Sequence, residues 1–153
     1  MTVMNNIPRL TIDTSVFISS FEESDSLHSE SLRFFNAINQ EESSIVVPVT
    51  IVFETFNNLI QRGWTDTSLM RAQFESMDVI SLDRFDITRA LPIFRQVKLK
   101  TADAIVVFVS KEYRAILVSW DKQLIKEATR VVSAMTPTEY LEYEDHPLFK
   151  ESI

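Results

Sequence analysis

Glycine, cysteine and long apolar runs are almost absent from this sequence of 153 residues. Gly63 is the single glycine, so neither a Walker-type phosphate loop nor the G-x-G-x-x-G turn of dinucleotide-binding proteins can form. The lack of cysteine excludes disulfides, thiolate zinc sites and cysteine nucleophiles, and it fits a cytoplasmic location. Residues 104–109, the longest apolar run, are too few to cross a bilayer, and residues 1–8 show no signal-peptide pattern, so we expect no membrane partner.

Positive charge is also scarce. The chain has 15 Lys and Arg against 22 Asp and Glu, and its net charge of −7 argues against a nucleic-acid-binding protein. The distribution along the chain modifies this conclusion, because residues 84–130 hold ten Lys or Arg and five Asp or Glu, a local charge of +5. Such polarity fits a basic surface beside an acidic one, and it fits solvated helix faces equally well.

The sequence does contain a regular alternation of strand-like and helix-like segments. Its length and its hydrophobic content of 45% fit one domain over residues 1–153, with residues 138–153 as a peripheral tail. The expected strands cover residues 9–13, 45–47, 79–82, 116–119 and 131–134. The expected helices cover residues 26–39, 50–61, 65–77, 84–97, 102–113, 121–129 and 136–143. This alternation predicts an α/β fold with a mostly parallel sheet and helices on both of its faces.

Residues 102–113 fit two kinds of element. Three valines and an isoleucine in this segment have high β-propensity and favour a buried strand. The segment is longer than a usual strand, Thr101 suits a helix N-cap, and Asp103 suits the first turn of a helix. We therefore favour a helix here, and we expect Thr50 to cap the helix of residues 50–61 in the same way.

Four acidic residues lie where predicted strands end or where the following helices begin. Asp13 and Asp121 follow strands, and Glu54 and Asp103 lie in the first turns of helices. Ligands of parallel sheets bind outside the carboxyl ends of the strands, so these four carboxylates can share one cavity. Crowded carboxylates repel each other, and a hard divalent cation removes that conflict. An all-oxygen set without nearby His or Cys favours Mg²⁺ or Mn²⁺ over zinc, and such ions support phosphodiester hydrolysis. Asp103 and Asp121 lie near helix starts and could instead be helix caps or dipole partners. Asp13, at the end of an apolar strand, and Glu54, in an apolar helix where an unpaired charge is costly, are harder to explain in this way.

Taken together, these residues resemble a PIN domain and, more narrowly, the VapC-like toxin ribonucleases. The matching stretches are IDTSVF at residues 12–17, PVTIVFE at residues 48–54, ADA at residues 102–104 and LVSWD at residues 117–121. Their order and spacing also fit the family, and the resemblance spans about residues 10–134. It implies a PIN-like three-layer sandwich, and it favours a helix for residues 102–113.

The resemblance also implies an activity, a cofactor and partners. The implied activity is metal-dependent endoribonuclease chemistry with Mg²⁺ or Mn²⁺ as the cofactor. Many relatives are toxins that a small antitoxin protein holds inactive, and many form homodimers. Carried over position by position, the acidic ligands fall on Asp13, Glu54, Asp103 and Asp121, and the family's neighbouring hydroxyl groups fall on Thr14 or Ser15 and on Ser119.

The sequence departs from the family pattern in two respects. Relatives often carry a glycine before the strand of residues 116–119, where this chain has the tripeptide of residues 113–115. The acidic balance means that RNA affinity has to come from local positive charge. Each candidate cation could instead be a solvated surface charge; the candidates are Arg95, Lys98, Lys100 and Lys122.

Two other function classes remain open at this point. The first is a non-catalytic PIN-like module that binds RNA or protein, although the complete acid set favours the enzyme. The second is a phosphatase or phosphoacceptor domain, although Asp13 does not open the D-x-D pattern of phosphatases. Trp120 could stack on a base, but we favour packing against a helix for its ring.

Overall fold

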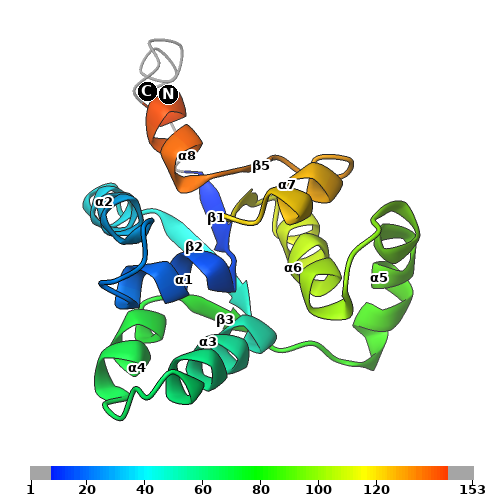
Figure 1. The fold of residues 1–153 in the computed structure, drawn as a ribbon. Helices are drawn as coiled ribbons and strands as arrows, with labels where there is room; N and C mark the ends of the chain where they lie inside the picture. Colours follow the sequence, from blue (N-terminus) through cyan, green and yellow to red (C-terminus); the bar gives the residue numbers. More distant parts are fainter. Residues whose placement is uncertain (1–7, 145–153) are drawn as a thin grey trace, which may run out of the picture.

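A computed structural model describes residues 8–144 of the chain (Figure 1). Five strands form one sheet in the order β3-β2-β1-β4-β5. All of its pairings are parallel, which confirms the predicted sheet. In chain order the strands are β1 (Arg9–Ile12), β2 (Ser44–Pro48), β3 (Asp78–Ile80), β4 (Ile116–Val118) and β5 (Ala134–Met135).

Helices follow the strands and flank the sheet. In chain order they are α1 (Thr14–Phe21), α2 (His28–Gln40), α3 (Val49–Gln61), α4 (Ser68–Glu75), α5 (Arg84–Gln96), α6 (Thr101–Glu112), α7 (Lys122–Ala128) and α8 (Pro137–Glu144). The chain steps from β1 to β2 to β3 in one direction and then returns past β1 to β4 and β5. Because crossovers between parallel strands are right-handed, the two directions place α1–α4 and α5–α7 on opposite faces. The predicted α/β sandwich is therefore correct.

The central strands are buried on both faces, as a sheet covered by helices requires. Leu10, Thr11 and Ile12 of β1 are all fully buried. Helix α6 packs across β2, β1 and β4, and the ring of Phe17 on α1 lies 4.7 Å from that of Phe74 on α4. Burial of this apolar surface is the main stabilising contribution to the fold. None of the helices within residues 8–144 is long and apolar enough to span a membrane.

Helix α1 is an element that the sequence analysis does not predict. Its residues, TSVFISSF, are buried on several sides, so the segment lacks the one-sided apolar period that identifies a surface helix. The side chain of Asp13 caps it by accepting a hydrogen bond from the backbone N–H of Ser15. The acidic residue at the strand end thus also starts a helix.

The two predicted threonine caps are wrong. Helix α3 begins at Val49 after Pro48, without a side-chain cap, and Thr50 lies inside its first turn. Helix α6 begins with Thr101 itself, and Lys100 occupies the N-cap position. The last strand is also displaced from residues 131–134, because the backbone N–H groups of residues 131 and 132 bond back to Ala128 and close the end of α7.

The C-terminal segment is described as far as residue 144. Helix α8 begins at Pro137, as expected for a proline in a first helical turn, and it packs against α2. Tyr140 is fully buried, and its ring makes an edge contact with that of Phe34 at 5.5 Å. Residues 145–153 of the predicted tail lie outside the described residues.

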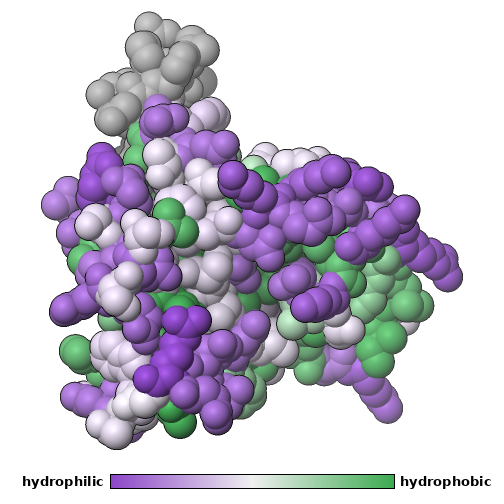
Figure 2. Space-filling view, in the orientation of Figure 1, coloured by the Kyte–Doolittle hydropathy of each residue, from purple (hydrophilic) through white to green (hydrophobic). Residues whose placement is uncertain are grey.

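Helix α5 carries the most conspicuous apolar surface in the view of Figure 2, where hydrophobic residues gather over its position. Phe85, Ile87 and Leu91 are 67%, 61% and 45% exposed. The helix packs chiefly against α6, which leaves much of its circumference open.

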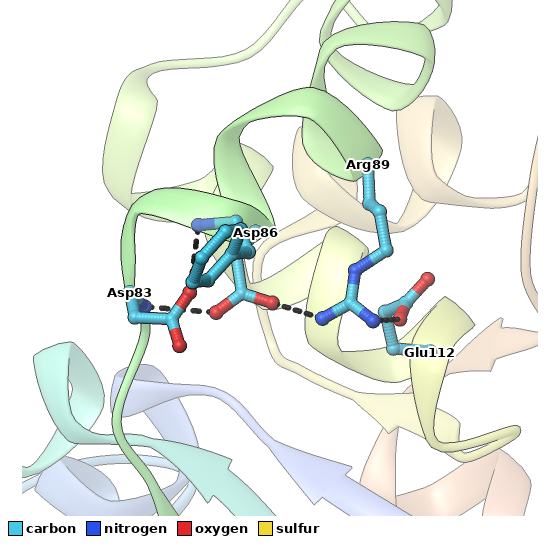
Figure 3. Close-up of polar contacts among 5 residues, drawn as sticks. Asp83, Asp86, Arg89 and Glu112 are labelled. Atoms are coloured by element: carbon cyan, nitrogen blue, oxygen red, sulfur yellow. Dashed lines mark hydrogen bonds and ion pairs between the residues drawn. The ribbon is translucent and has the colours of Figure 1, made fainter.

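An ion pair between Arg89 and Glu112 joins α5 to α6, and Figure 3 shows it with the polar contacts at the start of α5. Asp83 and Asp86 form a capping box at the start of α5. The guanidinium of Arg89 pairs with Asp86, and it also lies 3.5 Å from the carboxylate of Glu112 on α6. The same residues line a cavity of about 350 Å³, whose lining includes none of the four acids predicted to bind metal.

Candidate metal centre at the sheet switch point

The strand order reverses between β1 and β4, and open α/β sheets bind their ligands at such a switch point. Ile12 pairs with Val118 at the ends of these two strands. The backbone N–H of Asp13 then donates to the carbonyl oxygen of Val118 at 3.0 Å. The segments that carry Asp13 and Asp121 therefore leave the sheet side by side.

Asp13 is buried at the centre of this edge, with 6% of its surface exposed. Its Oδ2 accepts hydrogen bonds of 2.8 Å from the hydroxyls of Ser15 and of Ser119. The weaker contact from the backbone N–H of Ser15, at 3.4 Å, ends on the same oxygen. Because these bonds fix Oδ2, the other oxygen, Oδ1, is available to a ligand. The two predicted hydroxyl neighbours thus orient Asp13.

Glu54 and Asp121 approach the same edge from α3 and α7. The Oε2 of Glu54 accepts a hydrogen bond of 3.1 Å from the hydroxyl of Thr14, which follows Asp13 directly. Asp121 caps α7, since its Oδ1 accepts from the backbone N–H groups of Gln123 and Leu124 at 2.9 and 3.1 Å. The capping role considered for Asp121 is therefore real, and it leaves Oδ2 for a second role.

Asp103 lies within electrostatic reach of the other three carboxylates. The pKa of Asp103 is raised to about 6, first by burial and then by the charges of Asp13, Asp121 and Glu54, against a lowering by Lys100. A carboxylate with three like charges nearby is the situation that a divalent cation relieves. The structure thus places the charges of Asp13, Asp121 and Glu54 near Asp103, and a shared metal site of the four acids stays a prediction.

The donor set fits a hydrated magnesium or manganese ion. All four groups supply oxygen, which these ions prefer, and none of the four is in an ion pair among residues 8–144. In the described part of the chain, no three Asp, Glu or His side chains are close enough to ligate one ion together. Mg²⁺ usually keeps several waters and one or two carboxylates, so the wider spacing suits it.

The predicted RNA-contacting cations are all exposed. They differ in how many residues separate them from the acids in the sequence. Lys100 is the N-cap of α6, and its charge acts on Asp103. Lys122 is the first residue of α7 and follows Asp121. Arg95 and Lys98 lie further along the connection, at the end of α5 and just after it.

Sequence reasoning missed Ser31, a fully buried serine on α2. Its hydroxyl accepts a hydrogen bond of 2.8 Å from the indole N–H of Trp120, the residue before Asp121. The ring of Trp120 packs against the main core, in agreement with the packing role that the sequence favoured. The available signal was the position of Ser31 in the otherwise apolar stripe of α2, next to Phe34 and Phe35.

Comparison with known proteins decides the family. The family model of the PIN domain matches residues 10–130. The chain belongs to the PIN domain family. No match was found among curated proteins.

Solved structures share the fold of this PIN domain at low sequence identity. A toxin–antitoxin complex from Klebsiella pneumoniae superposes with a TM-score of 0.65 at 17% identity, over 84% of this chain and 97% of the other. VapC20 of Mycobacterium tuberculosis, a toxin that cleaves the sarcin-ricin loop, gives 0.63 at 14% identity, over 76% and 93%. FitAcB from Neisseria gonorrhoeae gives 0.63 at 11% identity, over 84% and 98%. At such identities the likeness establishes the fold alone.

Proposed function

We propose that this PIN domain is an endoribonuclease that depends on Mg²⁺ or Mn²⁺ and hydrolyses RNA phosphodiester bonds. The observation that carries the proposal is the position of three carboxylates near that of Asp103 at the switch point, where none of the four is in an ion pair within residues 8–144. A structural cluster of acids is ordinarily paired with Lys or Arg, because an unneutralised group of like charges is unfavourable. An exogenous cation and a substrate phosphate account for this arrangement.

Each side chain has a definite part in such a centre. Asp13, Glu54, Asp103 and Asp121 would hold the cation, one or two of them directly and the others through its bound waters. When bound, the cation supplies an activated water and positive charge against the phosphate oxygens. The hydroxyls of Ser15 and Ser119 hold Asp13 in one orientation. The hydroxyl of Thr14 does the same for Glu54.

The substrate contacts of the proposal come from basic residues beside the acids. Exposed lysines and arginines neutralise RNA phosphates and make binding salt-dependent. Lys100 and Lys122 flank two of the carboxylates and suit the phosphates nearest the cleaved bond. Arg95 and Lys98 would contact the strand further away.

The proposal includes partners. We infer a toxin of a type II toxin–antitoxin pair, acting in the cytoplasm, because the fold matches structures described as toxin–antitoxin complexes. The exposed apolar side chains of Phe85, Ile87 and Leu91 support a homodimer or a bound antitoxin, since patches of this kind mark protein interfaces.

A cleavage assay with labelled RNA tests the activity. The wild type is expected to cleave in Mn²⁺ or Mg²⁺ and to stop in chelator. Asp103→Asn should be inactive, and Glu112→Gln, which changes an acid at the other end of the same helix, should cleave like the wild type. Cleavage in chelator would contradict metal dependence. RNA binding without cleavage would favour the non-catalytic module.

A further inference from the structure

Trp120 is held at two points that belong to two different helices. Its backbone N–H donates to the hydroxyl of Ser15 on α1 at 3.0 Å. Its indole N–H donates to the hydroxyl of Ser31 on α2 at 2.8 Å. The backbone N–H of Asp121, the next residue, donates to the hydroxyl of Ser119 at 2.9 Å. The segment that presents Asp121 is thus fixed on both sides of Trp120.

The bond to Ser31 continues into a buried chain of hydroxyl groups. The hydroxyl of Ser19 donates to the carbonyl oxygen of Val16 at 3.1 Å. It therefore accepts from Ser31, at 2.6 Å. Ser31 donates to Ser19 and accepts from the indole of Trp120, so both of its hydrogen-bonding functions are used. Ser31 and Ser19 are 0% and 1% exposed, and no water competes for these bonds.

This chain closes on Asp13. The backbone N–H of Val16 donates to the carbonyl oxygen of Asp13 at 3.1 Å. At the other end, Ser15 accepts from Trp120 and donates to Oδ2 of Asp13. The hydrogen bonds thus form a closed circuit that contains Asp13 and the residue next to Asp121. Asp13, after β1, and the segment of Asp121, after β4, are held in a fixed relation by groups that carry no charge.

We propose that Ser31 is a positioning residue of the metal centre, acting through the indole of Trp120 to fix Asp121 relative to Asp13. The inference rests on the proposed function, since it assigns Ser31 a role toward the cation. It also assigns the Trp120 ring a role other than base stacking, because its N–H and its packing are already committed. Residues that orient metal ligands change metal affinity or activity about 10–100-fold when they are replaced.

The test compares Trp120→Phe, which keeps a packed ring but removes the N–H, with Ser31→Ala and with the double variant. The midpoint of the Mn²⁺-dependent rise in Tm and the midpoint of Mn²⁺-dependent RNA cleavage are measured for each. Both single variants should raise both midpoints about tenfold. The double variant should raise them no further than Ser31→Ala, because both substitutions remove the same bond.

Ser110→Ala is the matched control. Ser110 is also fully buried, and its hydroxyl donates to the carbonyl oxygen of Val106 at 2.8 Å within α6. Its replacement removes a hydroxyl of the same kind, and the Mn²⁺ midpoints should stay at the wild-type values.

The bond itself is read out by NMR of the full-length protein. Trp120→Phe identifies the Trp120 indole proton, and Ser31→Ala should shift that resonance upfield. The indole of Trp64, which donates to Glu22 at 2.8 Å, is the internal reference and should not move.

The outcomes separate this inference from the proposed function. A wild type without any Mn²⁺-dependent rise in Tm or cleavage would refute the proposed function and this inference with it. A metal-responsive wild type whose two variants lose Tm but keep the wild-type Mn²⁺ midpoints would refute the inference alone. Multiplying effects in the double variant would do the same. If Ser31→Ala does not fold, the midpoints of Trp120→Phe decide the matter.

Discussion

Two groups of carboxylates on this PIN domain differ in whether a cation of the protein is paired with them. Asp83, Asp86 and Glu112 gather between α5 and α6 around the guanidinium of Arg89 (Figure 3). The acids at the ends of β1 and β4 gather without any such cation in the described structure. The first group is an ordinary surface cluster paired with a cation of the protein, and for the second group we propose an external ion.

One acid in each group has a shifted pKa, and the two shifts have opposite signs. Hydrogen bonding by the backbone N–H of Asp83, and then by Arg89, lowers the pKa of Asp86. Burial, and then three neighbouring carboxylates, raise the pKa of Asp103. A lowered pKa marks an acid that the fold keeps charged at low cost. A raised pKa marks an acid whose charge the fold disfavours, which is common in functional sites.

The sharpest test of this contrast is a matched pair of substitutions. Asp103→Asn removes one charge from the unbalanced group and should lower RNA cleavage by at least about 100-fold, because a direct ligand matters at least as much as its supporting residues. Asp86→Asn removes one charge from the balanced group and should leave cleavage unchanged. Equal cleavage by the two variants in Mn²⁺ would remove Asp103 from the site.

Metal should distinguish the two groups through stability as well. An ion present at a hundredfold excess over its Kd stabilises the native state by about 2.7 kcal/mol, which is about 5–10 °C in Tm for a domain of this size. Thermal unfolding in Mn²⁺ and in chelator measures this rise. Asp86→Asn should keep the rise, and Asp103→Asn should lose most of it. A wild-type Tm that ignores saturating Mn²⁺ would contradict a shared metal site.

Part of the candidate site could be predicted from the sequence because it depends on the topology of the sheet. An acid that follows a parallel strand lies at the ligand edge whatever the side-chain packing, and Asp13 and Asp121 illustrate this. Helix α1 could not be predicted, because a helix buried on several sides has no amphipathic period. The caps at Thr50 and Thr101 failed because a threonine near a helix start has the same local signal at the N-cap and at the first helical positions.

The bond between Trp120 and Ser31 lay beyond sequence reasoning for a different reason. It joins residues 89 positions apart, on the segment after β4 and on α2. Only the packing of α1 and α2 beside the switch point brings them together. A buried serine in an apolar stripe shows that a polar partner is needed, but it does not identify the partner.

The pH dependence of stability should have opposite signs at the two groups. Because the pKa of Asp103 is about 6 in the folded protein and near 4 when unfolded, the native state binds the extra proton in this interval. The contribution of Asp103 to the free energy of unfolding is therefore fully present below pH 4 and is lost as pH rises to about 6. Asp86, with its lowered pKa, contributes stability above its unfolded pKa and loses it as pH falls. Denaturant unfolding in chelator between pH 3 and pH 7 measures both.

Single substitutions show which residue causes each change in the free energy of unfolding with pH. Asp103→Asn should abolish the loss of stability between pH 4 and pH 6. It should not change the loss of stability that occurs as pH falls below the unfolded pKa of Asp86. Asp86→Asn should reduce only the loss of stability at low pH. An Asp103→Asn curve that still declines from pH 4 to pH 6 like the wild type would show that another group binds the proton.

The smallest expected effect belongs to the cation that balances the surface group. Arg89→Gln leaves Asp86 and Glu112 without their shared partner, yet Arg89 is largely exposed, and water screens the carboxylates once it is gone. Tm should therefore fall by less than the Mn²⁺-dependent rise of the wild type, and the fall should shrink in high salt. RNA cleavage and the Mn²⁺ midpoint should not change, since the cavity beside Arg89 includes none of the four acids. A loss of cleavage in Arg89→Gln at unchanged Tm would show that the two groups are functionally connected, and the division between a balanced and an unbalanced cluster would then be wrong.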